Sequence, residues 1–114
     1  MTKVRVVLIT VPDRERAVGL CRTLVGERLA ACGNILPEVT SIYRWEGEIR
    51  EGPEVVVLLK VHQDTVPALT ERIAELHPHE VPEILALPVE AGFRPYLEWV
   101  TAETKDALPA AEDA

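Results

Sequence analysis

The sequence predicts an α+β domain of the ferredoxin-like kind, a β-α-β-β-α-β sandwich with an extended hairpin between its second and third strands and a C-terminal helix. Apolar residues recur at helical spacing in two segments, and the segments around them are β-branched or alternate between apolar and polar residues. Two right-handed β-α-β crossovers that share a hairpin place the first and third strands in the centre of the sheet. These two strands are also the most uniformly apolar, as central strands should be.

The chain has 114 residues, of which 47% are hydrophobic and 27% charged, and this is typical of one globular domain. We expect the domain to span residues 1–104 and residues 105–114 to form a frayed tail. The N-terminus runs directly into a strand pattern, and no apolar run approaches the ~20 residues that cross a bilayer, so we expect a cytoplasmic protein without a membrane partner. The net charge of −7 argues against nucleic acid as a partner.

The first strand and the first helix follow one another at the N-terminal end. Residues 4–11 are almost all β-branched or apolar, which predicts a strand buried on both faces. Pro12 and Asp13 are typical of a helix start, and the helix is expected to end near Leu29. Its apolar stripe consists of Ala17, Leu20, Cys21, Leu24 and Val25. Cys21 belongs to this stripe and is expected to lie in the core.

Residues 31–45 form the second extended segment, with a break expected at Asn34 and Pro37. Glu46 and Gly47 then supply a turn, because glycine tolerates a positive φ. The returning strand ends in residues 55–61, which are apolar on both faces apart from one lysine.

This hairpin, from about residue 35 to residue 61, is longer than a helix of about 15 residues could cover. Its edge presents Tyr43 and Trp45, and an exposed apolar edge is a site of association unless something covers it. The cover is either the C-terminal helix or another subunit, and we expect a homo-oligomer.

The second helix begins at Asp64 and Thr65 and ends at residues 76–78, since a proline restricts the residue before it. Residues 84–89 form the last strand, and Pro88 places that strand at an edge of the sheet. Residues 95–104 form a short amphipathic helix. Its apolar side carries Tyr96, Leu97, Trp99 and Val100.

The densest set of candidate metal ligands follows the second helix, at His77, His79, Glu80 and Glu83. Imidazole binds copper, zinc and nickel well, and thiolate from Cys32 would favour copper(I) or zinc. The alternatives are two surface histidines near a helix C-terminus and a cysteine that packs as a small hydrophobic residue.

Lys60 interrupts an apolar strand, and a buried lysine needs a partner. A polar pocket where subunits meet would bind a small anionic metabolite, although Lys60 could also simply point into water. The candidate pocket residues are Lys60, Glu54, Glu80, Glu83, Tyr43 and Trp45, the last two also being candidates for packing anchors between subunits. No serine or cysteine lies in a recognisable nucleophile elbow, so we expect a protein that is not an enzyme.

Seven segments together resemble the CutA divalent-cation-tolerance family. They are TVP at 10–12, ERLAACGNI at 27–35, SIYRWEGEI at 41–49, LK at 59–60, HPHEVPEI at 77–84, LPV at 87–89 and YLEWV at 96–100. The resemblance covers about residues 4–101, nearly without gaps. It implies a homotrimer of ferredoxin-like subunits, similar in architecture to PII signalling proteins, with a role in tolerance of divalent metals and especially of copper.

The chain departs from the family pattern at the positions that the resemblance associates with copper. Those positions are Ile9, Leu76 and His77 here, so only His77 keeps a metal-binding side chain. The family motif His-Pro-Tyr reads His-Pro-His in this chain, which makes His79 a substitute candidate, and Val61 replaces the threonine that usually follows the lysine. The resemblance implies Cu(II) or another divalent metal as the bound group. The alternative function is a PII-like signalling or adaptor module that binds an anionic metabolite or a partner protein between subunits.

Overall fold

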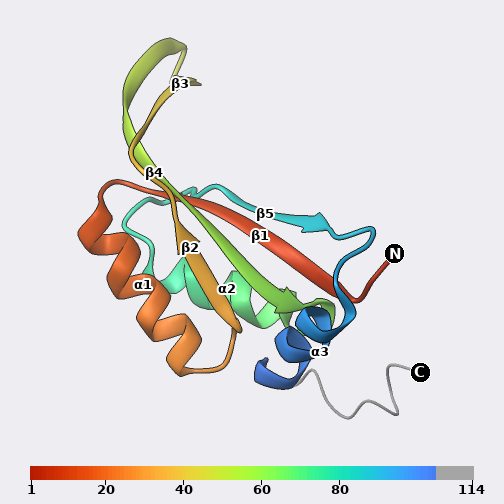
Figure 1. The fold of residues 1–114 in the computed structure, drawn as a ribbon. Coiled ribbons are helices and arrows are strands. Elements are labelled where there is room, and N and C mark those ends of the chain that lie inside the picture. Colours follow the sequence, from red (N-terminus) through yellow and green to blue (C-terminus); the bar gives the residue numbers. More distant parts are fainter. Residues whose placement is uncertain (105–114) are drawn as a thin grey trace.

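The structure is a computed structural model that describes residues 1–104, and the predicted frayed tail lies outside these residues. Its elements alternate as predicted, with one strand more than expected (Figure 1). They are β1 (Val4–Val11), α1 (Arg14–Gly26), β2 (Cys32–Ile35), β3 (Val39–Trp45), β4 (Glu48–His62), a 3₁₀ turn (Gln63–Thr65), α2 (Val66–Leu76), β5 (Ile84–Pro88) and α3 (Arg94–Glu103).

The main sheet is antiparallel with the strand order β2-β4-β1-β5, so β1 and β4 lie in the centre. Leu8 of β1 lies opposite Leu58 of β4 on one side and Leu85 of β5 on the other. The prediction of two central apolar strands is thus confirmed. The edge position predicted from Pro88 is also confirmed, because in the described part of the chain β5 pairs with β1 and with no other strand.

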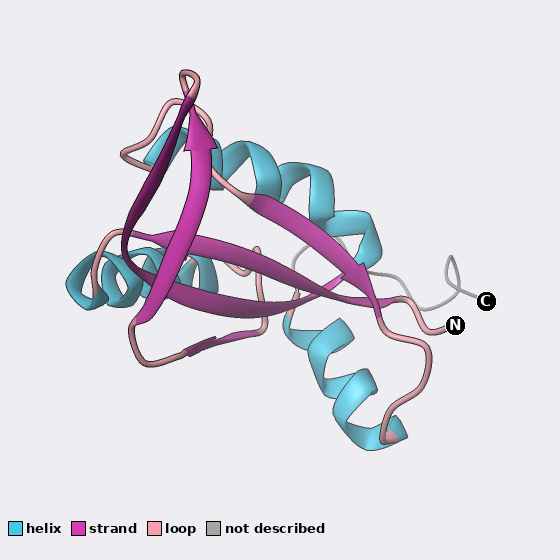
Figure 2. Cartoon of the chain, turned by 90° about the horizontal axis from the view of Figure 1, so that it is seen from above, coloured by secondary structure: helices cyan, strands magenta, loops and turns pink. Residues whose placement is uncertain are grey.

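The predicted second extended segment is divided into β2 and β3, as the expected break indicated, and the returning strand β4 follows the turn directly. The division falls at Pro37, after Ile35, whereas Asn34 lies inside β2. β4 pairs with β1 along one half and with β3 along the other, so the β3–β4 hairpin projects beyond the main sheet (Figures 1 and 2). The first helix ends at Gly26, earlier than predicted, because Arg28 adopts a positive φ of 62° and reverses the chain.

The core lies between α1, α2 and one face of the sheet. Asp13 begins α1 by accepting a hydrogen bond at 2.8 Å from the backbone N–H of Arg16. The largest fully buried side chains of the core are Val7, Ile9, Val11, Leu24, Val57, Leu59, Val61, Leu69 and Ile73. Cys21 belongs to the same cluster, as predicted, and burial is the main reason why the pKa of its thiol is raised.

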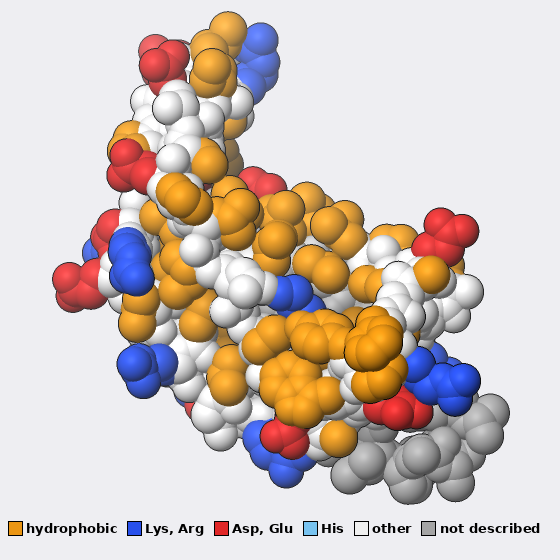
Figure 3. Space-filling model, in the orientation of Figure 1, with side chains coloured by type: hydrophobic (Ala, Val, Ile, Leu, Met, Phe, Trp, Pro, Cys, Tyr) orange, Lys and Arg blue, Asp and Glu red, His pale blue; other side chains and the backbone are white. Residues whose placement is uncertain are grey.

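Among residues 1–104, the opposite face of the sheet is covered at one end only, where Val100 of α3 packs with Val4 and Ala31. The chain holds α3 there through Arg28, whose Nη2 donates to the Ala102 carbonyl at 2.6 Å. α3 therefore does not lie on the projecting hairpin. Of the two covers predicted for the hairpin, the C-terminal helix is wrong, and another subunit stays a prediction. Figure 3 shows hydrophobic side chains gathered over this sheet face and over α3. No helix within residues 1–104 is long and apolar enough to cross a membrane.

Candidate functional site

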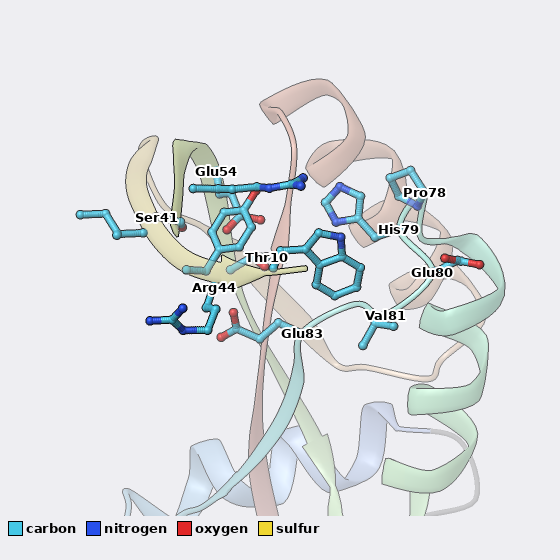
Figure 4. A pocket seen from close by; sticks show the side chains of 13 residues that line it. Thr10, Ser41, Arg44, Glu54, Pro78, His79, Glu80, Val81 and Glu83 are labelled. Atoms are coloured by element: carbon cyan, nitrogen blue, oxygen red, sulfur yellow. The ribbon is translucent and has the colours of Figure 1, made fainter. Parts of the chain in front are cut away.

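A cavity of about 810 Å³ lies between the β3–β4 hairpin and the segment that follows α2 (Figure 4). The end of β1 contributes Thr10 between these two walls. The complete lining is Thr10, Ser41, Ile42, Tyr43, Arg44, Trp45, Arg50, Glu54, Pro78, His79, Glu80, Val81 and Glu83. A volume of this size falls in the range of cavities that hold small molecules.

Most of the predicted pocket residues meet in this cavity. The structure places Tyr43, Trp45, Glu54, Glu80 and Glu83 in its lining, together with the predicted metal ligand His79. They come from two segments far apart in the sequence, which the pairing of β4 with β1 brings to one end of the sheet. Most residues that we assigned to one pocket from their chemistry are therefore neighbours in the structure.

Lys60 is the exception among the predicted pocket residues. It lies on β4 six residues after Glu54, which corresponds to about 20 Å along a strand. Its Cα lies opposite those of Val6 and Cys32, at the other end of the sheet from the cavity. Within one chain the length of β4 therefore separates Lys60 from these glutamates, and a pocket that joins them between subunits stays a prediction.

The sequence analysis did not identify Thr10, Ser41, Arg44 and Arg50 as lining residues. Thr10 could have been recognised as a lining residue, since it is polar near the end of a mostly apolar central strand. The residue is only 8% exposed, and within residues 1–104 its hydroxyl group makes no hydrogen bond. Arg50 gave no signal of this kind, because it is one of several charged residues next to the hairpin turn.

His77 is a buried residue next to the cavity, and its ring is hydrogen-bonded to the backbone on both sides. Its Nδ1 accepts a hydrogen bond from the backbone N–H of His79 at 3.0 Å, so Nε2 carries the proton and donates to the Thr10 carbonyl at 2.7 Å. The residue is 8% exposed. Both ring nitrogens thus have backbone partners, and binding of a metal to His77 would require one of these bonds to break.

The other candidate metal ligands are dispersed. Ile9 is fully buried in the core, and Cys32 lies beside Tyr96, far from His77 and His79. In the part of the chain that the structure describes, no three His, Cys, Asp or Glu side chains are placed to hold a metal ion together. His79 is exposed, and its ring lies 4.9 Å from that of His77, measured between ring centroids. His79 is therefore the more accessible imidazole of the pair.

Cys32 and Tyr96 form a second polar contact, on the open face near α3. The Sγ atom of Cys32 lies 3.3 Å from Oη of Tyr96. This hydrogen bond, aided by burial, raises the pKa of Tyr96 to about 12 because it favours the neutral phenol. Cys32 is partly exposed, so it is neither a core residue nor part of a described metal cluster.

Removal of the Cys32 thiol should make Tyr96 more acidic. In a Tyr43→Phe variant, Tyr96 is the only tyrosine, and its ionisation can be followed by phenolate absorbance. We expect a midpoint near pH 12 with Cys32 present and a midpoint closer to the usual value of about 10 after Cys32→Ala. Stability that depends on the neutral phenol is then lost as the pH rises through this interval. Equal midpoints in the two proteins would contradict the assigned hydrogen bond.

Comparisons with known proteins point to one family. Residues 5–103 match the family model described as CutA1 divalent ion tolerance protein. The chain is 52% identical over 99 residues to the divalent-cation tolerance protein CutA of Thermus thermophilus, an alignment that covers 87% of this chain and 96% of the relative. It is 47% identical to the mouse protein CutA over 97 residues, which cover 85% of this chain and 55% of the relative. The chain thus spans about half the length of the mouse protein.

Solved structures agree with these relatives. The divalent cation tolerance protein structure from Thermus thermophilus aligns with a TM-score of 0.87 and 51% identity over 90% of this chain and 99% of its own. The CutA structure from Xylella fastidiosa aligns with a TM-score of 0.88 and 38% identity over 91% of this chain and 100% of its own. Other relatives are described as chloroplastic in Arabidopsis thaliana and periplasmic in Archaeoglobus fulgidus, so the cytoplasmic location stays a prediction.

Proposed function

This chain belongs to the CutA1 divalent ion tolerance family, and we propose that it contributes to metal tolerance as a non-enzymatic, cytoplasmic homotrimer that binds copper(II) or another divalent ion. The observation that carries the proposal is the match to the family over residues 5–103, which includes nearly all of the described chain. A negative net charge favours the approach of cations in general.

His79 is the metal ligand that best fits this proposal. Its side chain is exposed, and Glu80 and Glu83 line the same cavity. An imidazole with carboxylates nearby suits copper(II) and zinc. Because one chain does not bring three such groups together within residues 1–104, a complete coordination sphere would need water or ligands from another subunit.

The homotrimer is supported by the uncovered part of the sheet. Leu85 and Leu87 of β5 are exposed on the same face as Val6 and Leu8 of β1. The projecting hairpin adds Ile42, Tyr43, Trp45 and Ile49, which are also exposed. Apolar surface on this scale is typical of proteins that bury it against another subunit.

A calorimetric titration of the assembled protein with copper(II), repeated with zinc, tests the metal proposal. We expect a saturable site and about tenfold weaker binding in His79→Tyr, which has the residue usual in the family, because one imidazole ligand is lost. Arg28→Lys is a control far from the cavity. The mass in solution should correspond to three chains of 12.6 kDa. Binding that His79→Tyr leaves unchanged, or a monomeric mass, would contradict the respective part of the proposal.

The cavity supports a second function, that of a signalling or adaptor module that binds a small molecule. Its volume is far larger than a metal ion needs, and its walls come from two separate segments, a common arrangement in ligand sites. The sequence analysis expected an anionic ligand because it placed Lys60 in the pocket. Since Lys60 lies elsewhere, the charge of the ligand has to be inferred from the groups that do line the cavity.

A further inference from the structure

A second cavity, which we call the helix groove, lies between α1 and the end of α2. It measures about 340 Å³, and Gly19, Leu20 and Leu76 are among the residues that line it. The two helices cover the core side of the sheet, whereas the proposed homotrimer buries the open face and the projecting hairpin. The imidazole and carboxylates of the metal proposal are not part of its lining. An assembly through the open face and the hairpin therefore leaves the helix groove in contact with solvent.

The floor of the helix groove is apolar. Val11 and Leu20 belong to the core and are 1% and 8% exposed, and Leu76 lines the same groove with 40% of its surface exposed. Leu76 occupies a position that the family resemblance associates with copper, and a leucine side chain offers no ligand atom to a metal. In this chain the groove therefore presents hydrocarbon surface at that position.

Gly19 widens the helix groove in the middle of α1. A glycine inside a helix destabilises it relative to alanine, so such a residue usually has a packing reason. No packing reason is found within residues 1–104, because a Cβ atom at Gly19 would meet no other atom within 4 Å. Glycine also allows a ligand to approach the backbone closely. An occupant that packs against the backbone of α1 would therefore account for this glycine.

Arg16 determines the charge of the helix groove. Its Nη1 donates to Oδ2 of Asp13 at 2.8 Å, and in the described part of the chain its Nε and Nη2 atoms make no hydrogen bond. These two nitrogens form the edge of a guanidinium group that binds a carboxylate through two parallel hydrogen bonds. No aspartate or glutamate of residues 1–104 lines the groove. A carboxylate is therefore the charged group that complements its lining.

We propose that the helix groove binds a small carboxylic acid with an apolar chain. The carboxylate accepts hydrogen bonds from Nε and Nη2 of Arg16, and the chain packs along Gly19 against Val11, Leu20 and Leu76. This site goes beyond the proposed metal tolerance. It shares no side chain with the metal proposal, so either one can fail without the other.

The test titrates the assembled, isotope-labelled protein with hexanoate and, as the matched cation, with n-hexylamine at the same pH and ionic strength. Amide resonances followed by NMR locate the binding as well as measure it. With hexanoate we expect saturable shifts at Gly19 and Thr23 and little change at Gly47 in the hairpin turn. Hexylamine should bind at least about tenfold more weakly, because it cannot accept hydrogen bonds from a guanidinium group. The net charge of −7 would favour the amine in any unspecific attraction, so a preference for the acid indicates Arg16.

Two substitutions and two matched controls assign the site to the helix groove. Arg16→Gln should weaken hexanoate binding by about tenfold, because hydrogen bonds to a charged group are lost. Gly19→Leu should weaken it by at least about tenfold, because the new side chain occupies the groove. The controls are Arg22→Gln, an exposed arginine of α1 outside the lining, and Gly26→Leu, where a Cβ atom also meets nothing within 4 Å. Urea midpoints of all four variants, compared with the wild type, separate a loss of binding from a loss of folding.

Each outcome supports or rejects the acid site. Saturable binding that both substitutions weaken, with the urea midpoints retained and both controls unchanged, would support it. The absence of saturable shifts, equal or tighter binding of hexylamine, or binding that Arg16→Gln and Gly19→Leu leave unchanged would each overturn it. Shifts that rise linearly and spread over all three helices would indicate unspecific contact only, and the site would again be rejected.

Discussion

Replacement of Leu59 with alanine should lower the free energy of unfolding by about 3 kcal/mol, because truncation of a buried leucine costs its transfer free energy plus that of a cavity. Leu59 is fully buried in the C-terminal half of β4, opposite Val7 on one side and Gly33 on the other. A Cβ atom at Gly33 would lie 2.9 Å from its Cδ2 atom, so the surrounding chain is already packed closely around the side chain. We expect little relaxation to fill the space.

Leu76→Ala is the matched control, because Leu76 is 40% exposed at the end of α2. It should cost less than about 1 kcal/mol. Both variants are measured by urea denaturation at the same protein concentration as the wild type, since assembly makes stability depend on concentration. Equal losses in the two variants would show that the core does not lie where the structure places it.

Replacement of His77 with alanine should also destabilise the fold, by about 2 kcal/mol, because it removes both hydrogen bonds of a buried ring. The Thr10 carbonyl and the backbone N–H of His79 would each lose a partner. We expect copper(II) affinity, measured on the folded variant, to remain within about threefold of the wild type, since neither ring nitrogen is available to a metal.

His79→Ala should give the opposite pattern, with little change in the urea midpoint and weaker metal binding, because its ring is exposed and accepts no backbone bond within residues 1–104. His77→Gln is a second variant that can keep one of the two hydrogen bonds, so it should recover part of the lost stability. If His77→Ala abolishes metal binding while the fold stays intact, His77 is a ligand after all, and the backbone role assigned to it is wrong.

The two histidines illustrate where prediction from residue type ends. Both are metal-binding side chains in one short segment, and the family resemblance favoured His77 over His79, whereas the structure leaves only His79 accessible. The difference arises because the end of α2 lies beside the end of β1, where the Thr10 carbonyl is within reach of one ring only. Such a contact between residues 67 positions apart depends on the packing of the helix against the sheet.

The candidate pocket was predictable in part, because residue type identifies side chains that suit a ligand but not their positions in space. Sequence reasoning identified Tyr43, Trp45, Glu54, Glu80 and Glu83 as chemically suitable, and the structure brings them together. It also included Lys60, because a lysine that interrupts an apolar strand needs a partner, but within one chain Lys60 lies about 20 Å along β4 from Glu54. The expectation of an anionic ligand depended on that one residue, so it now applies only to a pocket that another subunit completes.

The order of the elements, the two central strands and the buried stripe of α1 were predictable from the sequence, because they follow from local periodicity and from the few topologies that short connections allow. Val25 is the exception in that stripe: it is 37% exposed, because α1 ends at the next residue. The sequence also carried the resemblance to the family that the comparisons later identified. The three-dimensional packing was needed to show that both ring nitrogens of His77 bond to the backbone, that Lys60 lies away from the cavity of its own chain and that Thr10 lines that cavity. These properties depend on the register between β1 and β4 and on where α2 ends beside them, and register is a relation between segments that no single segment contains.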